Sequence, residues 1–135
     1  MAIFGTGIDI VEIGRIEQAV ARHGDAFLAK LFTAAEREYC DAMPRPATHY
    51  AARFAAKEAV AKAFGSGIGR EVGWLDMEIV RDESGRPSLR LTGAGRKFAD
   101  KHGITTVHLS LSHAKDHAVA SAVAETGGGT VDLSC

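Results

Sequence analysis

The chain has 135 residues, of which 46% are hydrophobic and 24% are charged, and its formal net charge at pH 7 is −1. These values are typical of one globular domain with its own core and leave too little chain for a second domain. They exclude the strongly basic surface that indicates nucleic-acid binding, and no apolar run approaches the roughly 20 residues that cross a bilayer.

The first predicted element is a β-strand over residues 2–11, where the sequence alternates with a period of two. Apolar side chains fall on one face, and Gly5, Gly7 and Asp9 fall on the other. Because aspartate is unfavourable in a strand, we expect an interaction that stabilises it. The two glycines leave an open strip on which a ligand or a second backbone could lie close. The alternative is that Asp9 caps the helix that follows.

The next part of the chain predicts three short helices. The first runs from about residue 12 to 22 and ends at Gly24, and a second covers about residues 25–31. A capping box at Thr33–Glu36 opens the third, which ends near Met43 before a stiff proline-rich connector.

An alanine-rich helix from about Thr48 to Phe64 is the stretch on which the functional prediction depends. Residues four apart share a helix face, so Arg53 lies over Lys57, and Glu58 lies over Lys62. The like-charged pair Arg53–Lys57 is favoured if an anion lies against it, and Glu58 could hold a divalent metal that bridges to that anion. The alternative is a solvated face with one ordinary Glu–Lys pair.

A glycine-rich loop, Gly65–Gly69, follows this helix. Walker-type phosphate loops precede a helix and end in Gly-Lys-Ser/Thr, so this loop does not predict a P-loop kinase or NTPase. Its glycines could still let backbone amides approach a phosphate. A plain helix cap and turn is the alternative.

The second half predicts two pairs of strands separated by a helix. We expect strands over residues 75–81 and 88–92, a helix over 94–102, and strands over 106–113 and 118–123. The first pair is joined by a predicted turn at Asp82–Pro87, which is rich in turn-forming residues. His108 and Ser110 share a polar strand face that could bond a ligand. No HExxH or Cys/His spacing predicts zinc, and Ser112 beside His113 predicts no triad because strand neighbours point to opposite faces.

The N-terminal sequence and the number of cysteines indicate the cellular compartment. The N-terminus lacks the basic and long apolar regions of a signal peptide, and two cysteines predict no disulfide framework, so we expect a cytoplasmic protein. Cys40 is expected to pack in its helix rather than react. The residues after Glu125 carry no pattern, which predicts a single domain over residues 1–126 and a flexible tail over 127–135.

Two carboxylates among cations suit Mg²⁺, which keeps several waters and takes phosphate oxygens as further ligands. Asp9 and Glu58 are the candidate ligands, and Arg53, Lys57 and Lys62 could neutralise the rest of a pyrophosphate. The residues alone predict a Mg²⁺-dependent enzyme that acts on a diphosphate ester. They leave open a hydrolase of nucleotide diphosphates.

The stretches Gly5–Ile16 and Arg53–Gly69 closely resemble those of the bacterial holo-(acyl-carrier-protein) synthase family. The turn Gly85–Pro87 and the strand Val107–His113 match it too, and the resemblance covers about residues 2–125. It implies a single α+β domain, the 4′-phosphopantetheinyl transferase fold, in which a small antiparallel sheet packs with helices. It also implies a homotrimer with its sites between protomers.

The resemblance implies an activity: transfer of 4′-phosphopantetheine from coenzyme A to a serine of apo-acyl carrier protein, in support of fatty acid biosynthesis. Adenosine 3′,5′-bisphosphate would be released. Asp9 and Glu58 would bind Mg²⁺, and Lys62 would stabilise the pyrophosphate and assist the leaving group. The proton acceptor would be Glu58 or a metal-bound water held by Asp9.

Binding residues are implied in the same way. Arg45 would meet the 3′-phosphate, and Arg15 and Arg22 would meet acidic residues of the carrier protein. The coenzyme A site would comprise Arg45, Arg53, Lys62, Gly65, Ser66, Gly67, Pro87, His108 and Ser110.

Another hypothesis is a non-catalytic module that binds coenzyme A or a carrier protein. Such a module should have lost a metal carboxylate or the lysine, whereas this chain keeps Asp9, Glu58 and Lys62 together.

Overall fold

The structure is a computed structural model that describes residues 1–127, so the tail predicted over 127–135 lies, from residue 128 on, outside the described residues. Its elements, in chain order, are β1 (Ala2–Glu12), α1 (Ile13–His23), α2 (Asp25–Leu31), α3 (Ala34–Asp41), α4 (Pro46–Phe64), the 3₁₀ turn η1 (Trp74–Asp76), β2 (Met77–Arg81), β3 (Pro87–Leu91), α5 (Gly93–His102), β4 (Ile104–His113) and β5 (His117–Thr126). The predicted α+β class is confirmed. None of the described helices is long and apolar enough to cross a membrane.

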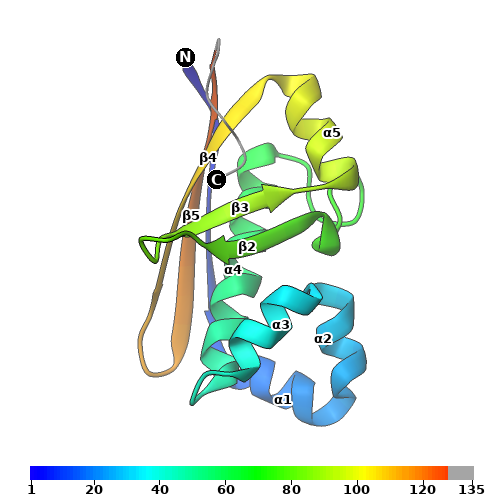
Figure 1. Cartoon of the computed structure of the whole chain (residues 1–135), viewed down its shortest axis with the longest axis vertical. Helices are drawn as coiled ribbons and strands as arrows, with labels where there is room; N and C mark the ends of the chain where they lie inside the picture. The colour runs from blue at the N-terminus through cyan, green and yellow to red at the C-terminus, as the bar shows by residue number, and fades with distance from the viewer. Residues whose placement is uncertain (128–135) are drawn as a thin grey trace.

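An antiparallel sheet in the order β1-β5-β4 runs along one side of the molecule, and α4 runs beside it (Figure 1). The hairpin β2–β3 forms a second, two-stranded sheet. Helices α1–α3 gather at one end of α4 and α5 lies towards the other (Figure 1). The sheet and α4 therefore form the frame on which the remaining elements are placed.

Small residues let α4 approach the sheet closely. The alternating alanines of β5 are fully buried beneath it, and alanines of α4 meet them in one core. On β1, a methyl group at Gly7 would collide with the carbonyl oxygen of Ala59, and one at Gly5 with that of Ala63. The open strip predicted along β1 is thus occupied by a second backbone, that of α4.

Within residues 1–127, no helix covers the opposite face of the sheet, which we call the bare sheet face. Ile8 and Ile10 of β1 are 64% and 65% exposed, although they alternate with residues that face α4. The register puts Ile8 and Ser110 on either side of Ser121, so β4 presents its polar residues on the same uncovered face. Ile8 and Ile10 therefore form an exposed apolar strip on this face of the sheet.

Capping chemistry defines the helix ends. The capping box at Thr33 and Glu36 is confirmed, since each residue's side chain accepts a hydrogen bond from the other's backbone amide. Helix α4 begins at Pro46, two residues earlier than predicted, because proline is well suited to the first helical position. It ends at Gly65, whose φ of 73° is a left-handed cap conformation that favours glycine.

The sequence interpretation was wrong for Lys57. Its side chain lies in the core, where Nζ donates to Oε1 of Glu36 at 2.7 Å and to the carbonyl oxygens of Leu31 and Trp74 at 2.7 and 3.1 Å. The second oxygen of Glu36 accepts from the Ile79 amide at 2.8 Å. The anion beside Lys57 is therefore the chain's own carboxylate, and Lys57 is not available to a bound diphosphate.

Candidate active site

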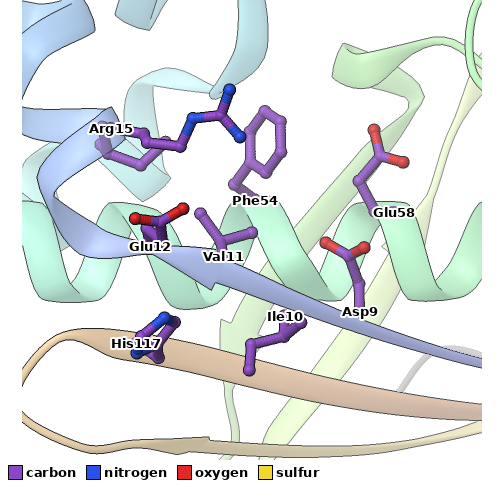
Figure 2. A pocket seen from close by; sticks show the side chains of 9 residues that line it. Asp9, Ile10, Val11, Glu12, Arg15, Phe54, Glu58 and His117 are labelled. Atoms are coloured by element: carbon purple, nitrogen blue, oxygen red, sulfur yellow. The ribbon is translucent and has the colours of Figure 1, made fainter.

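Asp9, Glu58 and Lys62 meet where β1 passes α4. Lys62 Nζ lies 3.1 Å from Oδ1 of Asp9 and donates to the Ile8 carbonyl oxygen at 2.9 Å. Figure 2 shows the carboxylates of Asp9 and Glu58 directed into the same region from the strand and the helix. Asp9 is not the cap of α1, because that position belongs to Glu12. The ion pair with Lys62 supplies the stabilising interaction expected for an aspartate in a strand.

The two carboxylates are close enough to influence each other. Burial raises the pKa of Glu58, the charge of Asp9 raises it further, and Lys62 opposes both effects. A cation between the two carboxylates would relieve their repulsion. Two oxygen ligands with open positions fit Mg²⁺, which retains waters and accepts phosphate oxygens. Within residues 1–127, no group of three or more His, Cys, Asp or Glu side chains is placed to hold an ion.

A cavity of about 470 Å³ extends from these carboxylates towards α1. Arg15 lines its other end, and Figure 2 shows the guanidinium of Arg15 beside the ring of Phe54. The predicted docking residue Arg15 thus shares one cavity with Asp9 and Glu58, whereas Lys62 is not among the lining residues. Arg22 lies exposed near the end of α1 and is not among the lining residues.

Of the nine residues that line this cavity, sequence reasoning predicted only Asp9, Glu58 and Arg15 as site residues, and Phe54 and His117 are among those it missed. Phe54 lies one helical turn before Glu58, so the four-residue spacing could have identified it. His117 comes from β5, where it pairs with Glu12 of β1. No local pattern indicates that pairing, because it depends on the register of two distant strands.

Three of the predicted coenzyme A contacts lie together elsewhere. Pro87, His108 and Ser110 line a cavity of about 540 Å³ between the hairpin and β4. His108 Nε2 lies 3.1 Å from Oε1 of Glu125, and Arg86 also lines the cavity. None of the residues that line this cavity lines the one beside Asp9.

Arg53 belongs to a further group, which we call the arginine–histidine cluster: Tyr39, His49, Arg53, Arg81 and His113. The guanidinium of Arg53 lies 4.2 Å from the centre of the Tyr39 ring, and that of Arg81 lies 5.9 Å from it. The His49 ring is 6.1 Å from the Tyr39 ring and 6.2 Å from the His113 ring, between centroids. These side chains come from α3, α4, β2 and β4, and the sequence prediction included Arg53 alone.

Arg53 is only 2% exposed, yet its Nε and Nη1 atoms have no hydrogen-bond partner among the described residues. Buried N–H groups without acceptors are costly, and a bound anion would supply acceptors for them. Arg45 stands at the start of the same helix, where its Nη1 donates to the Lys115 carbonyl oxygen at 3.1 Å.

The glycine-rich loop occupies a separate place, at the end of α4. Gly65 is the helix cap, so the plain-cap alternative describes that residue correctly. The Ser66 amide donates to the Ala61 carbonyl oxygen at 3.2 Å, while the buried Ser66 hydroxyl has no hydrogen-bond partner within residues 1–127. Gly67 has a φ of 68°, a left-handed backbone conformation that favours glycine.

Comparison with known proteins identifies the class. The model of the 4′-phosphopantetheinyl transferase superfamily matches residues 5–122, and the chain belongs to that superfamily. A holo-(acyl-carrier-protein) synthase of Syntrophus aciditrophicus is 47% identical over 123 residues, which are 91% of this chain and 96% of the relative. One from Moorella thermoacetica is 48% identical over 120 residues, 89% of this chain and 92% of the relative. The family resemblance seen in the sequence is confirmed, and the protein is a phosphopantetheinyl transferase of the holo-(acyl-carrier-protein) synthase type.

Solved structures agree on the fold. The holo-(acyl-carrier-protein) synthase of Neisseria meningitidis superposes with a TM-score of 0.87 at 37% identity, covering 92% of this chain and 99% of that one. That of Bacillus anthracis, in complex with coenzyme A (3′,5′-ADP), gives a TM-score of 0.79 at 40% identity, covering 94% and 100%.

Proposed function

We propose that the protein transfers the 4′-phosphopantetheine group of coenzyme A to a serine hydroxyl of apo-acyl carrier protein and releases adenosine 3′,5′-bisphosphate. The single observation that carries this proposal is the grouping of Asp9, Glu58 and Lys62 at the crossing of β1 and α4, in a chain of this family. We further propose that residues 1–126 form the transferase domain and that it acts in the cytoplasm, where its product serves fatty acid biosynthesis.

The donor set supports Mg²⁺ dependence, with Asp9 and Glu58 as the residues that would hold the ion. When bound, Mg²⁺ supplies positive charge to the pyrophosphate oxygens of coenzyme A. Lys62 is half-exposed and lies against Asp9, so its ammonium can swing to the phosphate as charge develops on the leaving group. Holding these charges on a strand and a helix keeps them oriented before the substrate arrives.

Arg15 supports a docking role because it stands at the far end of the cavity that contains the carboxylates. An acidic surface of the carrier protein that pairs with Arg15 would present its serine towards Asp9 and Glu58. Arg22 is exposed further along the same helix and would extend the contact. Charge pairing of this kind speeds association and fixes orientation.

The coenzyme A residues support a site shared between protomers. Lys62 lies by Asp9, whereas Pro87 and His108 line a different cavity and Arg53 lies in the arginine–histidine cluster. One nucleotide can meet all of them if two chains face each other. We propose a homotrimer in which the bare sheet face is buried and the cluster takes the 3′-phosphate, with Arg45 beside it and Gly65, Ser66 and Gly67 lining the pantetheine side.

The test of the activity is intact-mass analysis of apo-acyl carrier protein after incubation with the protein, coenzyme A and Mg²⁺, with an EDTA control. We expect the carrier protein to gain one phosphopantetheinyl group with Mg²⁺ and none in EDTA. Cleavage of coenzyme A without that gain would support the nucleotide-diphosphate hydrolase instead. Neither gain nor cleavage, with a carrier protein from the same cell, would support a binding module.

The shared site is tested by mixing two variants, each of which we expect to be inactive alone. Lys62→Ala removes one side of the proposed site and His113→Ala removes the other. If the site forms between chains, refolding the two together restores activity, because some interfaces combine an intact half from each chain. A mixture as inactive as its components, in oligomers of mixed composition, would contradict the shared site.

A further inference from the structure

Basic side chains recur every four residues along one face of α4. Arg45 stands at the N-cap, and His49 and Arg53 follow at intervals of one turn. One turn further along this face, Lys57 is paired with Glu36, whereas two nitrogen atoms of Arg53 have no hydrogen-bond partner in the described part of the chain. An anion that pairs with this face of α4 would therefore lie beside Arg53 and His49.

We propose that His49 is a phosphate-selecting residue, which takes up a proton from solvent when the 3′-phosphate of the nucleotide enters the arginine–histidine cluster. This inference rests on the proposed function, because it assumes that the donor is coenzyme A. It assigns a role to a residue that lies outside the group of Asp9, Glu58 and Lys62.

The surroundings of His49 determine the direction of the effect. The groups that face it are Arg53 of its own helix, Tyr39 of α3, Arg81 of β2 and His113 of β4. Burial lowers the pKa of His49, and the charges of Arg53, His113 and Arg81 lower it further. No carboxylate within residues 1–127 contributes to that shift. The imidazole is therefore neutral at pH 7 in the empty cluster.

A phosphate dianion reverses this balance. Its negative charge beside the ring favours the imidazolium, which gains a second N–H donor for the phosphate oxygens. Binding should then tighten as the pH falls from 8 towards 6, by up to about tenfold per unit for one linked proton. A nucleotide without the 3′-phosphate gains nothing from His49, so the residue favours coenzyme A over dephospho-coenzyme A.

The experiment is calorimetric titration of the full chain with adenosine 3′,5′-bisphosphate at pH 6.5, in two buffers of different ionisation enthalpy. The difference between the buffers gives the number of protons taken up on binding. The variants are His49→Gln and, as a matched control, His23→Gln, whose histidine is exposed at the end of α1. The ligand's own phosphate titrates equally with each protein, so the comparison isolates the histidine.

We expect proton uptake to fall in His49→Gln and to be unchanged in His23→Gln. The preference for coenzyme A over dephospho-coenzyme A should fall severalfold in His49→Gln. Equal proton uptake in wild type and His49→Gln would overturn the inference while leaving phosphopantetheine transfer intact. Active protein that does not discriminate the two nucleotides would overturn it as well, whereas absence of transfer would refute the proposed function itself.

Discussion

Replacement of Gly7 by alanine tests the closest contact on which the candidate site depends. Gly7 lies on β1 against the backbone of α4, two residues before Asp9. A β-carbon there would lie 2.9 Å from both the carbonyl carbon of Ala59 and the amide nitrogen of Ala63, and closer still to the Ala59 carbonyl oxygen. These are helix backbone atoms, so they cannot rotate away as a side chain does.

The magnitude follows from this overlap. Ordinary contact for a β-carbon begins at 3.4 Å, so α4 must move from β1 by at least the difference of 0.5 Å, and by more at the oxygen. Overpacking of this kind costs about 1–3 kcal/mol of unfolding free energy, and rigid neighbours favour the upper end. The same displacement separates Asp9 from Lys62 and Glu58, and we expect loss of transfer activity even in molecules that remain folded.

Gly14→Ala is the matched control. Gly14 lies in helix α1 with no atom within 4 Å of the added carbon, so alanine there should raise stability by about 0.5–1 kcal/mol. Urea unfolding at one protomer concentration measures both variants, and the transfer assay measures activity. A Gly7→Ala protein as stable and active as wild type would refute the close packing of β1 on α4.

Three further predictions concern other parts of the chain. Lys57→Met leaves the carboxylate of Glu36 buried without its cation, so we expect urea unfolding to show a loss of about 3–5 kcal/mol; a loss below 1 kcal/mol would contradict the buried pair. In steady-state kinetics, Arg15→Ala should raise the KM for carrier protein and leave the KM for coenzyme A unchanged; weakened coenzyme A binding would refute its docking role. Burial raises the pKa of Cys40 to about 11, so in a Cys135→Ser background a thiol reagent at pH 8 should label Cys40 only as fast as the protein unfolds, and rapid labelling of native protein would contradict this burial.

Much of the fold could be predicted because each element carries its own periodicity. The alternation in β1, the capping box at Thr33 and the glycine cap at Gly65 are local signals, and the structure contains all three. The start of β2 was placed too early because Trp74–Asp76 forms a 3₁₀ turn, which the Asp76 carboxylate holds by accepting from the Gly73 amide at 2.8 Å.

The site was predictable to the extent that its residues share one face or one motif. Spacing correctly related Glu58 to Lys62, but it could not show that Lys62 turns to Asp9 on a distant strand. Spacing also related Arg53 to Lys57 without revealing Glu36 as the anion beside Lys57. The arginine–histidine cluster was missed for the same reason, because its members come from four elements whose packing no local pattern specifies.

The most direct test of the central claim is the intact mass of apo-acyl carrier protein after incubation with Mg²⁺, coenzyme A and either wild-type protein or Glu58→Gln. Glutamine keeps the size of the side chain and removes its charge, so folding and coenzyme A binding can be verified separately. If Asp9 and Glu58 hold the ion that drives transfer, wild type adds one phosphopantetheinyl group and Glu58→Gln adds none in the same time. Equal addition by the two proteins would contradict the assigned site.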